Sequence, residues 1–174
     1  MTPEQRQLVF DLALNRVSLE EFSRRAGLDP RQPGIAAQVM RHALQSRDPV
    51  EVECALLLAN IGGISEHDVP TLCEILITPW HTRHEDVAGH LQRLRDPRSI
   101  DALSRAAVVK HAYLDYDDSH ALARKCTWAL ADIGTREARS RLEALSCNSD
   151  AELAAYAQKR LNAWEEERPR KRGD

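Results

Sequence analysis

The chain has 174 residues, of which 43% are hydrophobic and only 5% aromatic, and its net charge is −3. This length allows one domain with a substantial core, and the nearly balanced charge gives no field that would recruit nucleic acid or an anionic membrane. No apolar run approaches the ~20 residues of a membrane-spanning helix, and the first residues lack the pattern of a signal peptide. We therefore expect a cytoplasmic protein without a membrane partner.

Three short helices are predicted in residues 1–47. Ser18 followed by Glu21 forms a capping-box pattern at the start of the second helix, and Pro30 and Pro33 interrupt the chain after it. We interpret this part as a helical N-terminal cap, because it lacks the pattern that recurs later. The predicted helices cover residues 4–15, 18–27 and 35–45.

One pattern then recurs along the chain: a helix, a break that contains glycine or proline, and a second helix. Leu58, Leu91 and Leu130 occupy matching positions in the first helix of three such pairs. Leu161 occupies the same position in a fourth occurrence, which lacks a full second helix. Self-similarity at this period is typical of stacked helical repeats. We predict an all-α fold, a right-handed α-solenoid of about four helical hairpins over residues 48–164. The whole of 1–164 would be one domain, and 165–174 a charged, disordered tail.

The spacing of the matched leucines predicts an insertion. Leu58 and Leu91 are 33 residues apart and Leu130 and Leu161 are 31 apart, but Leu91 and Leu130 are 39 apart. The additional residues lie within 108–119, and insertions in solenoids often form loops on the binding side. Tyrosines supply contact area and carboxylates steer a basic partner, so we predict a protein-binding loop over 109–118. Its contact residues would be Tyr113, Asp115, Tyr116, Asp117 and Asp118.

The helix pairs over 50–76, 84–107 and 124–145 resemble HEAT repeats, in the short bacterial form shared with phycobilisome-lyase-like repeat proteins. This resemblance implies a scaffold that binds other proteins, such as a bacterial adaptor or toxin-immunity protein, although a few members are enzymes. In such repeats the second helices line the concave side, where their polar side chains face the partner. The resemblance adds Glu74, Asp101, Arg105 and Arg139 on the concave side, with Trp80 in a flanking turn.

A histidine-rich stretch supports an alternative function. The His84-Glu85 pair resembles the pairs by which the HEAT-repeat hydroxylase of deoxyhypusine holds two irons, and a metal-dependent or lyase-type enzyme would use His81, His84 and Glu85, with His90 beyond. Such a cage needs ligands from several repeats, and the matching positions of the other repeats lack such a pair. We therefore expect no metal and no cofactor, with Glu85 complementing a helix dipole.

The remaining motifs predict no further activity. The acidic residues 115–118 lack the glycine and the distal glutamate of a calcium-binding EF-hand loop. Residues 20–28 resemble the first part of a DNA-binding helix-turn-helix, but Pro30 and Pro33 delay the helix that would read the bases, so nucleic acid is not an expected partner. The four cysteines, at positions 54, 73, 126 and 147, form no CxxC pair and predict buried, protected free thiols. We predict a non-catalytic protein-binding module.

Overall fold

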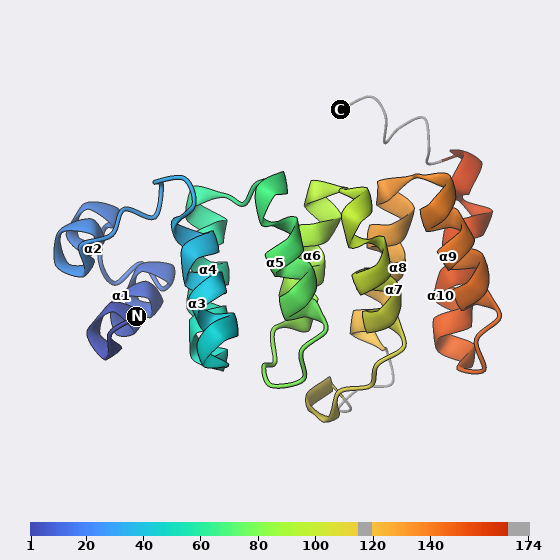
Figure 1. The fold of residues 1–174 in the computed structure, drawn as a ribbon, viewed down its shortest axis with the longest axis horizontal. Coiled ribbons are helices and arrows are strands. Elements are labelled where there is room, and N and C mark those ends of the chain that lie inside the picture. Colours follow the sequence, from blue (N-terminus) through green and yellow to red (C-terminus); the bar gives the residue numbers. More distant parts are fainter. Residues whose placement is uncertain (115–119, 167–174) are drawn as a thin grey trace. The chain divides into compact units, whose positions relative to one another are not determined.

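The computed structural model describes residues 1–114 and 120–166, which form helices and contain no strand within these ranges (Figure 1). The all-α fold class is therefore confirmed. No helix in the described ranges is long and apolar enough to cross a membrane. The α-helices are α1 (Pro3–Ala13), α2 (Leu19–Ala26), α3 (Ile35–Ser46), α4 (Pro49–Gly62), α5 (Val69–Leu76), α6 (His84–Leu94), α7 (Ile100–Ala107), α8 (Ala121–Ile133), α9 (Arg136–Ser146) and α10 (Ala151–Asn162). Short 3-10 helices cover Glu66–Asp68, Pro97–Ser99 and Ala112–Leu114.

Side-chain caps begin several of these helices, and of the capping box predicted at Ser18 and Glu21, the Ser18 half is present. Thr2 and Gln5 form a capping box at α1, and the Ser18 hydroxyl accepts a hydrogen bond from the backbone N–H of Glu21 at α2. Asp48 accepts hydrogen bonds from two backbone N–H groups at the start of α4. Each such cap stabilises a helix by about 1 kcal/mol, so these residues fix where the helices start.

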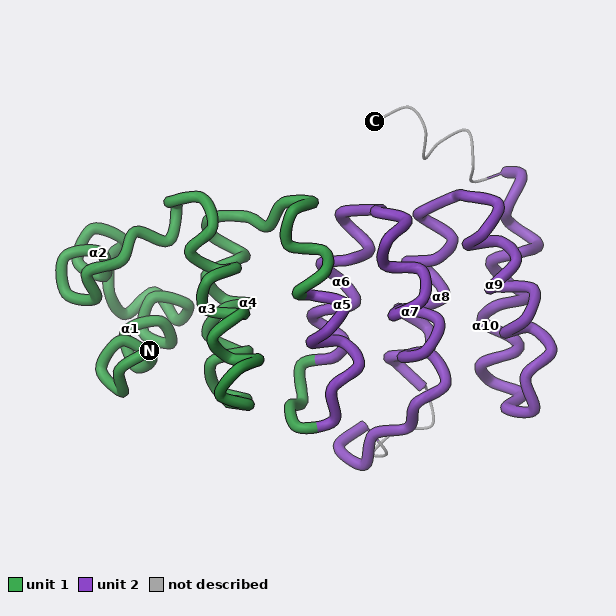
Figure 2. Tube along the Cα trace, viewed as in Figure 1, with its two compact units in different colours: residues 1–71, 80–83 green, residues 72–79, 84–174 purple. Residues whose placement is uncertain are grey.

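The chain divides into two compact units (Figure 2). Unit 1 comprises Met1–Thr71 and Trp80–Arg83, and unit 2 comprises Leu72–Pro79 and His84–Asp174. In unit 1, α3 packs against α4, and α1 packs against both α2 and α4. The largest buried side chains of unit 1 are Leu8, Phe22, Met40 and Leu58. The sequence-based prediction of one domain over 1–164 stays a prediction.

Unit 1 also buries a carboxylate. The Glu51 side chain is 0% exposed, and its oxygens contact the Met1 α-amino group, the His42 imidazole and the Arg6 guanidinium, the last at 2.9 Å. Burial acts to raise the pKa of Glu51, but the hydrogen bonds from Met1, His42 and Arg6 outweigh it and hold this pKa below its ordinary value. These partners keep the carboxylate ionised inside unit 1.

A close backbone approach fastens the linker before α3 onto α4. A Cβ atom at Gly62 would lie 1.8 Å from the carbonyl oxygen of Pro30, which no real side chain can do. Gly62 therefore acts as a packing residue as well as the predicted helix breaker. The next residue, Gly63, has φ of +83° and ends the helix.

In unit 2, α8 lies at the centre of the packing. It contacts α6 and α10, which are first helices of the predicted pairs, and also α7 and α9, which are second helices. Figure 1 shows the α7 and α9 ribbons following one another along the unit, and these two helices also contact each other. Leu91, Leu103, Leu130 and Leu142 are fully buried here.

The repeat register predicts which residues are buried, but not at every position. The third matched residue is 40% exposed in α4, where it is Ile61, whereas Leu94 and Ile133 are half-buried in α6 and α8. The first two matched residues are fully buried in all three helices: Cys54 and Leu58, Val87 and Leu91, Cys126 and Leu130.

The cysteine prediction is partly wrong. All four thiols are free, but Cys147 is exposed and Cys73 is half-buried, whereas Cys54 and Cys126 are buried. Cys147 follows the last residue of α9, outside the apolar stripe of that helix. Burial raises the pKa of the Cys54 and Cys73 thiols to about 11 and raises that of Cys126 further, so those three are the unreactive ones.

Candidate functional site

An open groove of about 650 Å³ lies beside the predicted insertion, within unit 2. We call it the insertion groove. Its walls are the segment after α7, the start of α8 and the turn that leads into α10. Figure 1 shows these three segments at the lower end of unit 2. It is lined by residues 107–111, Leu114, residues 120–123, residues 148–150 and Leu153.

Two adjacent valines give the insertion groove an exposed apolar side. Val108 and Val109 follow the C-terminal end of α7 and are 50% and 48% exposed. Their backbone N–H groups donate hydrogen bonds to Arg105 and Ala106, so this segment is a continuation of the helix end. An exposed apolar pair on an ordered backbone is a suitable contact surface for another protein.

A single carboxylate fastens both ends of the insertion to the start of α10. Lys110 Nζ lies 2.9 Å from one Asp150 oxygen, and His120 Nδ1 lies 3.4 Å from the other. Asp150 also caps α10 by accepting hydrogen bonds from the backbone N–H groups of Glu152 and Leu153. The hydrogen bonds from Lys110 and Leu153 lower the pKa of Asp150, so the carboxylate stays charged near neutral pH.

The predicted contact residue Tyr113 makes an internal hydrogen bond. Its hydroxyl lies 2.7 Å from His84 Nδ1, and His84 Nε2 lies 2.7 Å from the carbonyl oxygen of Thr78. A carbonyl can only accept, so Nε2 carries the proton, and in the neutral imidazole Nδ1 accepts from the tyrosine hydroxyl. Tyr113 therefore ties the insertion to the buried His84, and only part of its ring is left for a partner.

His111 lines the insertion groove and contacts both His84 and Tyr113. Its ring stacks on that of His84, with 3.8 Å between the centroids, and lies 5.5 Å from that of Tyr113. Burial lowers the pKa of His111, which favours the neutral imidazole. Of the three rings only His111 lines the groove, and its contacts with His84 and Tyr113 support it from behind.

The histidines of the metal alternative each have another partner. His84 uses both ring nitrogens as described above, and His81 Nδ1 accepts a hydrogen bond from the backbone N–H of Arg83. Glu85 lies 3.5 Å from Lys125 Nζ. Within the described ranges, no group of three or more His, Cys, Asp or Glu side chains is placed to hold a metal ion. The described residues thus give the metal alternative no support.

The fourth residue of that alternative is a neutral core histidine. His90 is 6% exposed, and the Arg93 guanidinium donates to its Nδ1 at 2.8 Å. Burial, together with the positive charge of Arg93, lowers the pKa of His90 to about 4. His90 therefore stays uncharged at neutral pH.

Three of the charged residues predicted for the second helices form ion pairs within unit 2. Asp101 on α7 is 65% exposed and lies 3.8 Å from Arg105 on the same helix and 3.7 Å from Arg141 on α9. Arg139 hydrogen-bonds Glu143 and Glu165, each at 3.1 Å. These side chains form a polar surface on α7 and α9 of unit 2.

The other predicted contact residues are less closely connected with the groove. Glu74 is exposed on α5, and Trp80, in unit 1, is half-buried with its ring edge-on to His81. Asp115, Tyr116, Asp117 and Asp118 lie outside the described residues.

Sequence reasoning missed the residues that shape the groove. Asp150 carries a recognisable signal, because an aspartate before an alanine-rich helix is a typical N-cap. Its pairing with Lys110 had no such signal, since 40 residues separate the two. The exposure of Val108 and Val109 also depends on neighbours that the local pattern does not specify.

Comparison of the chain with protein-family models, with curated proteins and with solved structures gives no match. A functional conclusion therefore depends on the geometry of the sites.

Proposed function

We propose that this protein is a non-catalytic helical-repeat module that binds another protein through the insertion groove and the adjoining polar surface of α7 and α9. The observation that carries this proposal is the insertion groove itself, where two exposed valines lie beside charged groups already held in place by Asp150. An apolar centre with a polar rim is the usual composition of a protein-binding surface.

We also propose that the helix pairs of unit 2 form a right-handed α-solenoid of HEAT-like type. The packing of α8 supports this, because it contacts both the preceding and the following first helix, and α7 and α9 contact each other. In stacked repeats each pair contacts its neighbours in this way. The resemblance to short bacterial HEAT repeats favours the role of an adaptor or toxin-immunity protein, and the free thiols suit the predicted cytoplasmic location.

The chemistry of the groove determines how a partner would be held. Val108 and Val109 would supply the desolvated contact, and Asp101 with its arginine neighbours would steer the approach. The insertion contributes three aspartates, at positions 115, 117 and 118, which favour a partner with a basic surface.

The proposal is tested by a double substitution, Val108→Ser with Val109→Ser. A partner captured by the full-length chain in cells is purified, and its Kd for each variant is measured by calorimetry. We expect the double variant to bind at least about tenfold more weakly, equivalent to about 1.4 kcal/mol, because the groove loses its apolar side.

Val50→Ser is the matched control, since Val50 is 38% exposed on α4 of unit 1 and does not line the insertion groove. Its Kd should equal that of the parent. Equal binding by the parent and the double valine variant would remove the insertion groove from the interface.

A further inference from the structure

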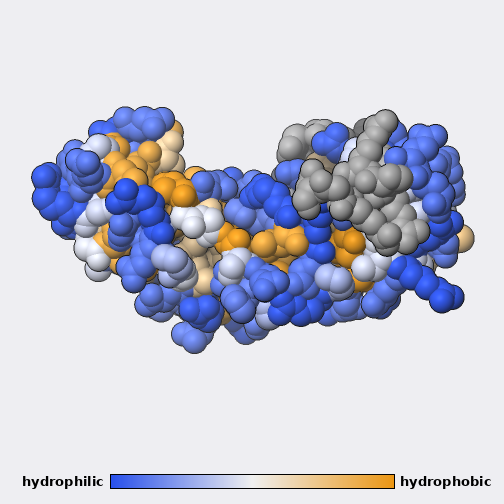
Figure 3. All heavy atoms as spheres, turned by 90° about the horizontal axis from the view of Figure 1, so that it is seen from above, coloured by the Kyte–Doolittle hydropathy of each residue, from blue (hydrophilic) through white to orange (hydrophobic). Residues whose placement is uncertain are grey.

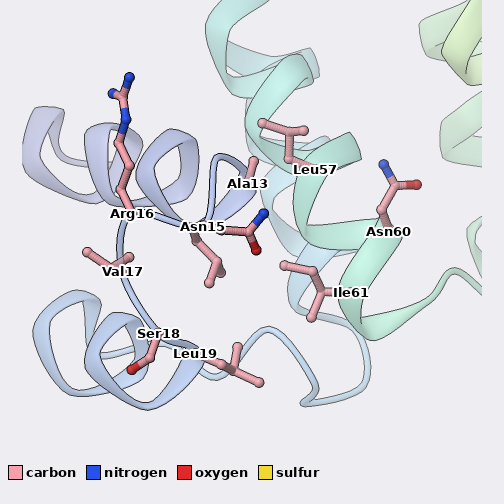
Figure 4. A pocket seen from close by; sticks show the side chains of 10 residues that line it. Ala13, Asn15, Arg16, Val17, Ser18, Leu19, Leu57, Asn60 and Ile61 are labelled. Carbon is pink, nitrogen blue, oxygen red and sulfur yellow. The ribbon is translucent and has the colours of Figure 1, made fainter.

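Unit 1 contains a second open cavity, of about 660 Å³, where α1 and α4 end and α2 begins (Figure 4). Leu19, Leu57 and Ile61 form apolar walls, and the Asn15 side chain lies at its edge. The space-filling view shows apolar side chains gathered at the end of unit 1 that carries α1 and α2 (Figure 3). We call this space the N-terminal cavity.

The internal repeat indicates what kind of group would fill the N-terminal cavity. Leu57 matches His90 and Ala129 in the repeat register; these two are buried, whereas Leu57 is only half-buried. Ile61 is 40% exposed, while its counterparts in α6 and α8 are half-buried. The same face of the helix is thus less completely covered in α4 than in α6 and α8. An aliphatic group would complete the packing.

The side-chain amide of Asn15, at the edge of the N-terminal cavity, could hydrogen-bond to the backbone of a bound peptide. Asn15 follows α1 with φ of +56°, and its backbone N–H donates to the carbonyl of Leu12, which fixes the position of the residue. Figure 4 shows its amide directed toward Ile61, and the residue is exposed, so a partner can reach the amide. A carboxamide both donates and accepts, as a peptide group requires of its partner. α4 also ends at the cavity, where the last carbonyls of a helix lack intrahelical donors.

The charge at the cavity favours an acidic occupant. Arg16 is the only charged residue of the lining, and its side chain is 65% exposed. It forms an ion pair with Asp11 at 3.6 Å, and an exposed pair of this kind is weak enough for a partner's carboxylate to replace. Figure 4 shows Arg16 extending away from Ile61, so an acidic group would bind beside the cavity and not inside it.

We propose that the N-terminal cavity binds an extended, acidic segment of a partner protein. An aliphatic side chain of that segment would lie between Leu19, Leu57 and Ile61, its backbone would hydrogen-bond to Asn15, and a neighbouring carboxylate would pair with Arg16. The segment is extended because a helix satisfies its own backbone groups and would leave the amide of Asn15 unused. This site lies in unit 1 and is separate from the proposed function of the insertion groove.

The test uses the full chain labelled with nitrogen-15 and an acetylated, amidated hexapeptide with the sequence glycine, aspartate, leucine, isoleucine, serine, glycine. We expect saturable shifts of the backbone amides of Asn15, Leu19 and Ile61, with a Kd of about 1 mM. Replacing leucine and isoleucine of the peptide by serine should remove the shifts, and replacing aspartate by lysine should weaken binding about threefold, since an exposed ion pair contributes little.

Asn15→Gly removes the amide but keeps the left-handed backbone, and it should weaken peptide binding at least about threefold, as the loss of one net hydrogen bond predicts. Gln38→Ala, an exposed amide on α3, is the matched control and should bind like the parent. The proposal is overturned if Asn15→Gly binds like the parent, if the serine peptide shifts the same amides, or if no amide of unit 1 shifts at about tenfold above that Kd. The same spectra report on the insertion groove, so failure at one site leaves the other measurable.

Discussion

Asp48 in unit 1 and Asp150 in unit 2 obey the same local rule but have different long-range partners. Each precedes a first helix of the repeat and accepts hydrogen bonds from two backbone N–H groups. Asp48 pairs with Arg6, 2.6 Å away, which also contacts the buried Glu51, whereas Asp150 pairs with Lys110 and His120 at the insertion. The helix cap is a property of the local sequence. The distant residue that pairs with the aspartate determines whether this carboxylate stabilises a core, as Asp48 does, or shapes a groove, as Asp150 does.

A large effect is expected at the buried carboxylate that Asp48 and Arg6 adjoin in unit 1. Glu51→Ala should lower the free energy of unfolding by about 3 kcal/mol, because the partners of a buried carboxylate lose their counter-charge. Arg6 and His42 keep some solvent access, which places the value at the lower end of the usual range. Urea denaturation would measure it. Glu53→Ala is the matched control on the same helix, since Glu53 is 31% exposed and should cost far less.

The same carboxylate makes stability depend on pH. The pKa of Glu51 lies below its ordinary value of 4.5, so its contribution is present above that pH and is lost as the pH falls through the lower, folded-state value. The difference in unfolding free energy between the parent and Glu51→Ala should therefore shrink on acidification. A difference that stays constant down to about pH 2 would show that the contacts of Glu51 do not depend on its charge.

The second effect tests the centre of unit 2. Leu130→Ala should lower the free energy of unfolding by about 2–5 kcal/mol, because Leu130 is fully buried in α8 and its loss leaves a cavity. Ile133→Ala, one turn further along α8 and half-buried, should cost less. Thermal unfolding of the two variants side by side would check this order, and the reverse order would contradict the repeat register.

The third effect separates the two aspartates. Asp48→Ala and Asp150→Ala should each cost about 1 kcal/mol through loss of the cap. Only Asp150→Ala should speed hydrogen exchange of the backbone amides at 109–111, because, of these two aspartates, only Asp150 pairs with residues at the insertion. Equal exchange rates in the two variants would show that the insertion is held by other contacts, such as the bond between Tyr113 and His84.

The last prediction concerns the rates at which the four thiols react and involves no change in stability. A thiol reagent should label Cys147 at once in the native protein, Cys73 slowly, and Cys54 and Cys126 only after unfolding, following their exposure. Mass spectrometry of the labelled peptides would give this order directly. Early labelling of Cys126 would mean that α8 opens locally in the native state.

Much of the fold could be predicted because its signals are local. Helical periodicity placed the third and sixth helices at the start residues that α3 and α6 have, and Thr2, Ser18 and Asp48 are N-caps whose partners lie within three residues. The matched Leu58, Leu91 and Leu130 are buried because a helix with a single apolar stripe has only one face to cover. The position of the insertion followed from the same register.

The sites depended on contacts between residues far apart in the chain. The sequence predicts Tyr113 as a partner contact, but its hydroxyl hydrogen-bonds to His84, 29 residues earlier, and Asp150 pairs with Lys110, 40 residues earlier. Gly62 reads as a helix breaker, yet its lack of a Cβ also admits the Pro30 carbonyl. The sequence by itself determined the helices and their buried faces, because hydrogen bonding and periodicity act within a few residues. Only the tertiary structure decided which polar groups meet and where the packing leaves a groove, because those outcomes depend on how separate helices come together.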